Sequence, residues 1–307
     1  MTQILTVIAP LFLIIFTTAL LQRLRNIGEN WSTVLNEFAL KIGLPVLIFS
    51  ALSKVPFSFS AQAELILSNS LFILFCLILA AIVGKILKLE RKMFRTLFIC
   101  FAFGSVAYLG IPILVQVYGE PIIPTTTLIV AIYLFWVFTI EIGYLDYSME
   151  KKKSAVAKNI LKNLFTNPLL VSVILGILIG SFQIQLPSIL TKSLDMITAS
   201  VTPTVLIVIG LFIGKSKIGR LKEWFPIFCF SILTLMILPA IFYFGAKIFG
   251  YPPTQFSSSI IQAAMPLAIT PFALADRYNL DKVFIARSIV LSTILSILTL
   301  PFWISIL

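Results

Sequence analysis

The chain alternates long apolar runs with short polar connections. Ten runs stand out, and most approach the length of about 20 residues that a helix needs to cross a bilayer. They cover residues 4–21, 34–52, 65–87, 96–117, 122–144, 168–182, 188–213, 224–249, 256–275 and 283–306. Runs this long with few charges are typical of membrane-spanning helices. The pattern therefore predicts an all-α polytopic membrane protein with ten transmembrane helices.

Composition agrees with this prediction. Of the 307 residues, 59% are hydrophobic and only 11% are charged, whereas a soluble domain carries about 25% charged residues. Residues 1–3 carry no positive charge, and Arg23 and Arg25 follow the first apolar run, which is not the pattern of a cleavable signal peptide. We expect a multi-pass protein of the cytoplasmic (inner) membrane.

The basic residues predict the orientation. The connections after the first, third, fifth, seventh and ninth runs, with their flanks, hold 19 of the 23 lysines and arginines. Because cytoplasmic loops are enriched in these residues, both termini are expected outside. The net charge of +11 is then spread over one membrane face, which suits contact with anionic membrane lipids and gives no indication of nucleic-acid binding.

A central polar segment divides the runs five and five. We expect a first five-span repeat over residues 1–148, a cytoplasmic linker over 149–167, and a second five-span repeat over 168–307. Within the linker, apolar residues are spaced for a short amphipathic helix on the membrane surface: Val156, Ile160, Leu161 and Leu164. Five spans cross an odd number of times, so the second half would be inverted relative to the first.

Matching residues indicate an internal repeat. Glu37 precedes Pro45 by 8 positions in the second run, and Asp195 precedes Pro203 by 8 positions in the seventh. Coincidence is the alternative, since the chain has 16 prolines. Inverted repeats of this kind are common in secondary transporters.

The fourth and ninth runs, at matching places in the two halves, contain helix-breaking residues. Pro112 lies in the fourth run near Gly104 and Gly110, and Pro266 and Pro271 lie in the ninth. A break inside a bilayer is tolerated where the freed backbone lines a cavity. The amide ends of half-helices suit an anion, and unwound carbonyls suit a cation. The two broken spans therefore predict a binding site near the bilayer midplane.

Four stretches of sequence resemble the auxin efflux carrier family. They are "LNEFALKIGLPVLIF" from residue 35, "FGSVAYLGIPIL", "NPLLVSVILGILIG", and the long stretch that begins "AAMPLAITPFALADRYNLDK". The resemblance implies ten spans in two inverted five-helix repeats, with spans four and nine broken and crossed. It also implies secondary transport of small organic anions, such as dicarboxylates in bacteria and auxin in plants. The short central linker suits a bacterial-type, malate-permease-like member.

The candidate substrate-binding residues lie in the two broken spans. They are Ser105, Tyr108, Gly110, Pro112, Gln262, Pro266, Thr270 and Pro271. Ser105 and Thr270 occupy positions where the family often has asparagine. A hydroxyl has a shorter reach and a single hydrogen to donate, so the substrate of better-known members is not transferable to this chain.

Charged residues within the spans are candidates for ion coupling or for balancing the substrate's charge. Glu37 and Lys41 are four positions apart, on one helix face. They form either a structural ion pair or a functional pair, in which Lys41 balances a substrate anion or Glu37 carries a proton. Asp195, near Lys192, has the same alternatives. Glu141, near the cytoplasmic end of span five, is expected to be solvated.

The sequence gives little indication of catalysis, metal binding or a cofactor. The chain has no histidine and only three cysteines, all in apolar runs, and no phosphate-binding loop, so we expect no catalytic residue, metal site or cofactor. The prediction is a secondary active carrier that moves a small organic anion by alternating access, coupled to a proton or sodium gradient. A passive anion channel is the alternative, and a membrane-embedded enzyme is less favoured. A homodimer is a candidate assembly.

Overall fold

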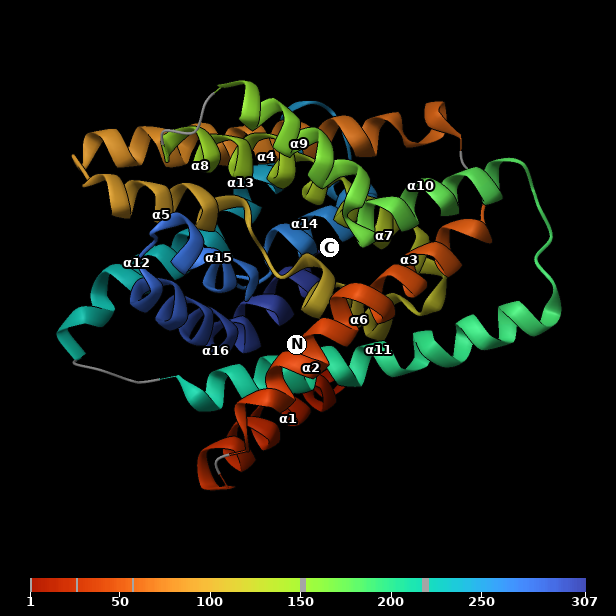
Figure 1. The fold of residues 1–307 in the computed structure, drawn as a ribbon, viewed down its shortest axis with the longest axis horizontal. Helices are drawn as coiled ribbons and strands as arrows, with labels where there is room; N and C mark the ends of the chain where they lie inside the picture. The colour runs from red at the N-terminus through yellow and green to blue at the C-terminus, as the bar shows by residue number, and fades with distance from the viewer. Residues whose placement is uncertain (1, 26, 57, 150–152, 217–220) are drawn as a thin grey trace.

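The computed structural model describes residues 2–25, 27–56, 58–149, 153–216 and 221–307, which contain helices and no strand (Figure 1). The α-helices are α1 (Thr2–Arg25), α2 (Glu29–Phe38), α3 (Leu44–Ser53), α4 (Phe59–Ile86), α5 (Arg91–Ala102), α6 (Ile111–Tyr118), α7 (Ile123–Trp136), α8 (Ile142–Ser148), α9 (Lys153–Thr166), α10 (Pro168–Ser181), α11 (Ser188–Lys215), α12 (Phe225–Ile232), α13 (Leu238–Ile248), α14 (Ser257–Ala263), α15 (Thr270–Tyr278) and α16 (Lys282–Ile306). Four π-helical segments are η1 (Ala39–Gly43), η2 (Val106–Gly110), η4 (Val137–Glu141) and η6 (Leu233–Ile237), and three 3-10 segments are η3 (Glu120–Ile122), η5 (Leu221–Trp224) and η7 (Pro253–Phe256).

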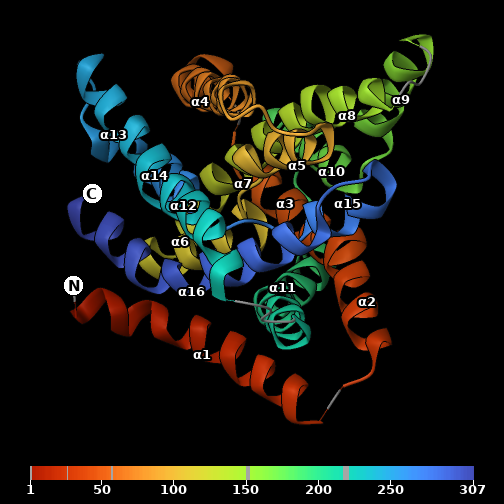
Figure 2. The same cartoon turned by 90° about the vertical axis from the view of Figure 1, so that its left-hand side faces the viewer.

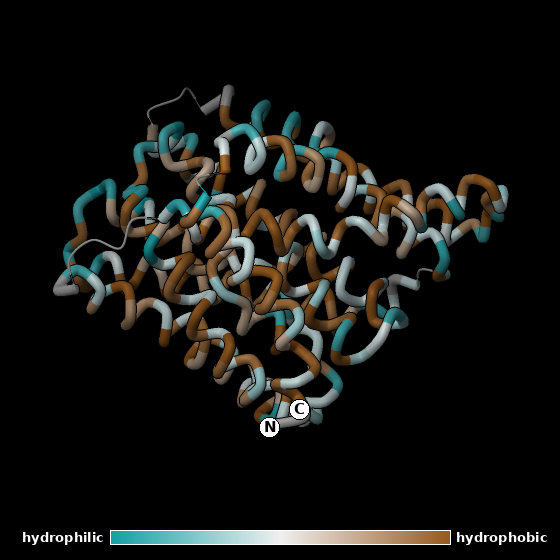
Figure 3. The backbone as a smooth tube through the Cα atoms, turned by 90° about the horizontal axis from the view of Figure 1, so that it is seen from below, coloured by the Kyte–Doolittle hydropathy of each residue, from teal (hydrophilic) through white to brown (hydrophobic). Residues whose placement is uncertain are grey.

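The prediction of an all-helical membrane protein is confirmed. Within the described ranges, seven helical stretches are long and apolar enough to cross a membrane. The other three expected spans correspond to α10, which has 14 residues, and to the two runs that are interrupted. In Figure 3 apolar residues run along the helices, and polar residues gather mainly at helix ends and connections.

The start of α10 follows from its sequence. Asn167 accepts hydrogen bonds from the backbone amides of Leu169 (2.9 Å) and Leu170 (3.4 Å), and Pro168 occupies the first turn. An asparagine cap followed by proline satisfies the orphan amides at a helix start. Before it, α9 forms the helix predicted for the linker and meets α10 at an angle of 60°.

Three prolines inside the spans follow π-helical turns, whereas Pro10, Pro203 and Pro301 lie within continuous α-helices. In three places the π segment ends two residues before a proline: η1 before Pro45, η2 before Pro112, and η6 before Pro239. Proline lacks an amide hydrogen and its ring clashes with the carbonyl one turn earlier, and a wider turn removes that carbonyl from the ring. Pro112 therefore lies within a continuous helical rod, Val106–Tyr118. The interruption of span four lies earlier, at residues 103–105.

One set of helices packs through glycines. We call α1, α2, η1, α3, α10 and α11 the scaffold group, in which α1 crosses α11 and packs against it, and α3 packs against α10 (Figures 1 and 2). A Cβ atom on Gly210 of α11 would lie 2.5 Å from the carbonyl oxygen of Ile15, and one on Gly180 of α10 would lie 2.4 Å from that of Val55. Gly214 and Gly176 make similarly close approaches. Small residues four positions apart let membrane helices approach this closely.

The remaining membrane helices form a second set around the two broken spans. We call α4–α8 and α12–α16, with their π segments, the crossing group. Here α4 packs against α5 and α7, α12 against α16, and α13 against α14. The scaffold group meets this set where α1 contacts α6 and α16, and where α3 and α10 contact α7. The broken segments thus lie inside the crossing group, close to its boundary with the scaffold group.

The glycine contacts generate a stability prediction. Gly210→Ala should destabilise the protein by about 1–3 kcal/mol, because the added methyl group meets backbone of α1 that cannot rotate away. Gly245→Ala on α13 is the matched control, since nothing lies within 4 Å of a Cβ atom there. Thermal unfolding of both variants in detergent, followed by tryptophan fluorescence, measures the difference. Equal melting temperatures would contradict the close packing of α1 on α11.

Candidate functional site

Two non-helical segments, residues 103–105 and 266–268, interrupt spans four and nine and pair with each other. The Ser105 amide donates to the Pro266 carbonyl (2.7 Å), and the Ala268 amide donates to the Phe103 carbonyl (2.9 Å). Gly104 and Leu267 face each other in an antiparallel bridge. Each break therefore satisfies backbone groups that the other leaves exposed, as a low-dielectric surrounding requires.

A hydroxyl on α16 completes this pairing. The Leu267 amide donates to Oγ of Ser292 (3.1 Å), which is fully buried. Ser288 and Ser296 lie one turn before and one turn after Ser292 on the same buried face. The sequence analysis missed this contact, although a serine repeated every four residues in an apolar helix was the available signal.

Four helix ends meet near the paired segments. α5 ends at Ala102 and α14 at Ala263, whereas η2 begins at Val106 and α15 at Thr270. Because the segments run antiparallel, the start of η2 lies beside the end of α14, and the start of α15 lies beside the end of α5. We call the two paired segments, residues 103–105 and 266–268, the crossing. Each side of the crossing therefore presents one amide end, suited to an anion, and one carbonyl end, suited to a cation.

The crossing borders a small cavity whose lining includes polar groups without a partner among the described residues. Its volume is about 20 Å³, and Gly104, Met265 and Leu267 line it together with Tyr133 and Gln262. A space of this size holds about one water molecule. The Tyr133 hydroxyl and Oε1 of Gln262 are buried without a hydrogen-bond partner among the described residues, while Nε2 of Gln262 donates to the Thr126 carbonyl (3.3 Å). Buried polar atoms without partners are uncommon and suit a polar ligand or water.

The structure brings several of the expected site residues together. Ser105 and Pro266 share a hydrogen bond, and a Cβ atom on Gly110 would lie 3.6 Å from Cγ of Gln262. Thr270 and Pro271 begin α15, on the other side of the paired segments. The predicted residues thus surround the crossing from both sides, and they do not all line one cavity.

Tyr108 connects the crossing to the scaffold group. Its hydroxyl donates to Oδ1 of Asn36 on α2 (2.7 Å). Asn36 was not among the predicted residues, although it directly precedes Glu37. The contact ties one half of the broken span four to a helix of the other set.

Glu37 and Lys41 form the expected ion pair. Their side chains lie 3.1 Å apart and are 58% and 64% exposed, respectively. An exposed pair on one helix contributes little to stability, about 0.3–0.5 kcal/mol.

Asp195 makes its ion pair with Lys54 at the end of α3 (2.8 Å), and Oγ of Ser50 donates to the same carboxylate oxygen (3.5 Å). The alternative of an ion pair between Asp195 and Lys192 is not the arrangement found, because α3 lies against α11 and brings Lys54 to the carboxylate. Both charges are about half exposed.

The expectation that Glu141 is solvated is wrong. Its side chain is fully buried, and neither carboxylate oxygen has a hydrogen-bond partner among the described residues. Position along the helix suggested solvent, but α5, α8 and α9 pack around η4 and cover it.

Asp146, which the sequence analysis also missed, is fully buried between three helices. It accepts hydrogen bonds from the hydroxyl of Tyr278 on α15 (3.2 Å) and from Nδ2 of Asn159 on α9 (3.3 Å). It thereby connects the first half of the chain to the linker helix and to the second broken span.

A larger basic cavity lies at one end of the boundary between the two groups. We call this cavity of about 720 Å³ the basic vestibule, and it is lined by Lys215, Lys282, Arg287, Ser32, Thr33 and Phe212, among others. Phe212 stacks edge-on against Phe272 with the ring centroids 4.8 Å apart. The vestibule lies between α2 and α11 of the scaffold group and α15 and α16 of the crossing group, so an anion that enters it reaches the boundary between the groups.

An all-helical polytopic chain with two interrupted helices that pair at their breaks has the architecture of a membrane transporter. Residues 3–304 match the family described as membrane transport protein, and the chain belongs to that family. The protein is therefore a multi-pass integral membrane transporter and not an enzyme.

Three relatives illustrate the similarity. An uncharacterized transporter of Methanocaldococcus jannaschii is 28% identical, over 90% of this chain and 89% of that protein. The "Putative malonate transporter" of Rhizobium meliloti is 23% identical, over 97% of this chain and 94% of that protein. Auxin efflux carrier component 5 of Arabidopsis thaliana is 28% identical over 48% of this chain and 43% of its own length. The resemblance to the auxin efflux carrier family is confirmed.

The Ser292 contact generates a prediction about the crossing. Ser292→Ala should lower stability by about 1–3 kcal/mol, because the buried Leu267 amide loses its partner. Ser305→Ala on the same helix is the control, since its exposed hydroxyl bonds only within α16. Thermal unfolding in detergent measures both. A Ser292 variant as stable as the control would show that the hydroxyl does not support the break.

Proposed function

We propose that the protein is a secondary carrier that moves a small organic anion across the cytoplasmic membrane by alternating access. The single observation that carries the proposal is the pairing of the two broken spans beside a cavity lined by Gln262 and Tyr133, whose Oε1 and hydroxyl are buried without a hydrogen-bond partner among the described residues. The cavity has room for about one water, so a substrate binds only after the helices around the crossing separate. The malonate in the name of the Rhizobium relative supports a small dicarboxylate.

The crossing and the basic vestibule suit successive steps of anion capture. Of the three cations that line the vestibule, Lys282 is paired with Asp276 and Arg287 with Glu223, so Lys215 is the one left, among the described side chains, to attract anions to the boundary between the scaffold and crossing groups. The amide ends of η2 and α15 then offer the anion partial positive charge without a formal charge in the membrane. Lys41 is a further cation for the substrate, with Glu37 and Asp195 as candidate coupling groups.

We further propose ten spans in two inverted halves, residues 1–148 and 168–307, joined by the linker over 149–167. Support comes from the seven continuous spans, from the short α10, and from one interrupted span in each half. In this arrangement the crossing group moves against the scaffold group, which glycine contacts hold together. The Tyr108 contact to Asn36 lies between the groups and would change in each cycle.

The transport proposal is tested in liposomes. The reconstituted protein should accumulate a small organic acid, with radiolabelled malonate as the first probe, under an imposed pH or sodium gradient. Gln262→Leu should reduce uptake at least tenfold, because it removes the unpartnered amide oxygen from the crossing. Gln255→Leu, an exposed position where the amide contacts Glu64, should transport normally.

Two outcomes would contradict the proposal. If none of a panel of mono-, di- and tricarboxylates moves or binds, the protein is not an organic-anion carrier. If anions move with an ohmic conductance that no gradient couples, it is a passive channel.

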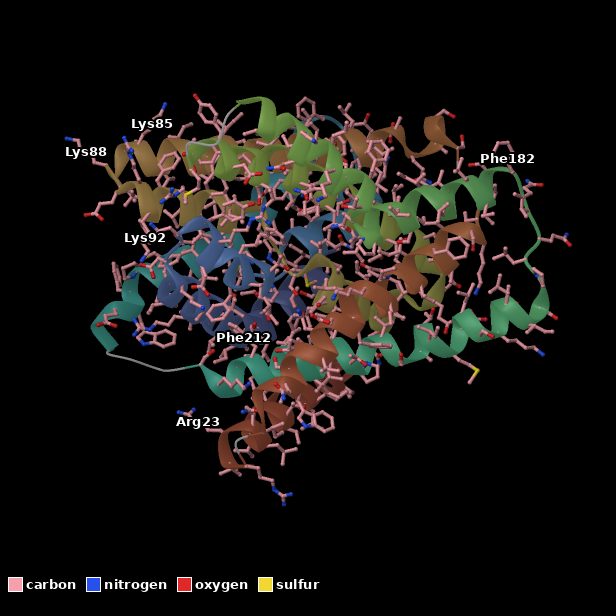
Figure 4. All side chains as sticks on the ribbon, in the orientation of Figure 1. Arg23, Lys85, Lys88, Lys92, Phe182 and Phe212 are labelled. Atoms are coloured by element: carbon pink, nitrogen blue, oxygen red, sulfur yellow. The ribbon has the colours of Figure 1, made fainter. Side chains whose placement is uncertain are left out.

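The orientation is tested by cysteine labelling. We propose that both termini lie outside and the linker inside; in Figure 4, Lys85, Lys88 and Lys92 extend from one end of the molecule and Phe182 lies at the opposite end. On a background without the native cysteines, a cysteine at residue 88 should react only with reagents that reach the cytoplasm, and one at residue 182 only from outside. The reverse pattern would overturn the orientation, and labelling of both from one side would overturn the span count.

A further inference from the structure

A carboxyl group is enclosed in the crossing group and has no hydrogen-bond partner in the part of the chain that the structure describes. Glu141 ends the π-helical segment η4, its side chain is 0% exposed, and both carboxylate oxygens lack a hydrogen-bond partner among the described residues. A charge in such a place is unfavourable unless it is neutralised or paired. Ionisable groups inside membrane segments commonly mark ion or proton pathways, and π-helical turns are frequent at functional sites.

Glu141 lies on the helix face that leads to the crossing. Tyr133, Val137 and Glu141 are four positions apart and are all buried, so they share one face. Tyr133 lines the small cavity beside the crossing and lies about 12 Å along the helix from Glu141. Cys76 and Cys100 also line the cavity, and the Glu141 carboxylate is within electrostatic reach of both thiols.

On its other side, Glu141 is one turn from a second cavity. This space of about 360 Å³ lies at the end of the helices that the basic loops assign to the cytoplasm, and Arg91, Arg95, Tyr144 and Tyr147 are among its lining residues. Tyr144 follows Glu141 by three positions, one helical turn away. Water in that cavity would come within one turn of the carboxyl group, so Glu141 stands between a cytoplasmic water space and the crossing.

None of the described groups around Glu141 forms an ion pair that would neutralise an ionised carboxylate. Among the described side chains, the titratable or charged groups on the elements packed against η4 are Arg91, Lys92, Arg95 and Cys100 on α5, Tyr133 on α7, Tyr144, Asp146 and Tyr147 on α8, and Lys158 and Lys162 on α9, and Cys76 on α4 lies within electrostatic reach. Nη1 of Arg95 contacts Sδ of Met149, and Asp146 is held by Tyr278 and Asn159. Arg91, Tyr147 and the three lysines are exposed. No ion pair to Glu141 is present in the described part of the chain. A proton is therefore the simplest neutralising partner, because a metal cation needs several oxygen ligands and, apart from Asp146, which Tyr278 and Asn159 hold, the residues around Glu141 supply thiols, phenols and cations.

We propose that Glu141 binds the proton that this carrier transports together with its anionic substrate. The inference rests on the proposed function and deepens it by naming the coupling residue. Protonated from one side, Glu141 is neutral and compatible with the closed arrangement of the crossing group. When water reaches it from the other side, it releases the proton, and the charged carboxylate favours the open arrangement. The proton also offsets one negative charge of the anion during its passage.

The test compares two activities of the same vesicles. Exchange of radiolabelled malonate without a gradient measures anion transport, and accumulation with an acidic exterior measures coupling. One coupled proton should give about tenfold accumulation for each pH unit of gradient. In Glu141→Gln, which is similar in size and cannot titrate, exchange should continue while the accumulation is lost. Glu120→Gln, at an exposed position where the same span begins, is the control and should accumulate malonate as the unmodified protein does.

The outcomes separate this inference from the proposed function. Absence of exchange by the unmodified protein contradicts the carrier proposal itself. Exchange with unaltered pH-driven accumulation in Glu141→Gln, coupling to sodium alone, or loss of coupling only in Glu37→Gln overturns the role of Glu141.

A second measurement does not depend on the choice of substrate. Infrared difference spectra of the reconstituted protein, recorded across pH, should contain a carboxylic acid carbonyl band that is missing in Glu141→Gln and kept in Glu120→Gln. If the glutamine variant does not fold, Glu141→Asp keeps a titratable group and should shift this band and the pH profile of uptake. An identical band and profile in that variant would overturn the proposal.

Discussion

Hydrogen bonds between two interrupted helices hold the centre of this protein together. Inside a bilayer no water is present to satisfy an opened helix, so a break persists only where protein replaces the lost backbone contacts. Here the Ser105 amide and the Pro266 carbonyl, from opposite halves of the chain, satisfy each other, and Ser292 holds a third group. Neither broken span could keep its opening alone. The converging helix ends, the bridge between Gly104 and Leu267 and the cavity beside it all depend on this mutual pairing.

The two sets of helices differ in how they are packed. In the scaffold group, glycines on α10 and α11 bring backbones into direct contact, which holds these helices firmly together. The crossing group meets it through side chains, through the hydrogen bond from Tyr108 to Asn36, and across the basic vestibule. A boundary with an open, charged cavity is the place where one set can shift against the other without breaking a close-packed backbone contact.

The acidic residues of the two groups also differ: Glu37 and Asp195 belong to the scaffold group, and Glu141 belongs to the crossing group. Glu37 and Asp195 each have a lysine partner and remain more than half exposed, so either pair can open at little free-energy cost. Glu141 is enclosed and without a partner in the described structure, so its protonation is tied to the arrangement of the helices around it. The spacing of Glu37 and Lys41 in the sequence indicates their pairing, whereas no local sequence pattern indicates that Glu141 is buried.

The sequence by itself determined the membrane-spanning class, the helix starts such as Asn167–Pro168, the Glu37–Lys41 pair and the two spans that are interrupted. Each follows from hydrophobic length or from contacts within one or two helical turns, which are local properties. The tertiary structure alone decided that span four is interrupted at residues 103–105 and that a π-helical turn allows the helix to continue through Pro112. It also decided that Lys54 pairs with Asp195 and that Glu141 is buried. These features depend on which helices, far apart in the sequence, lie side by side in the fold. The spacing of residues along the chain does not give the distances in space between such helices.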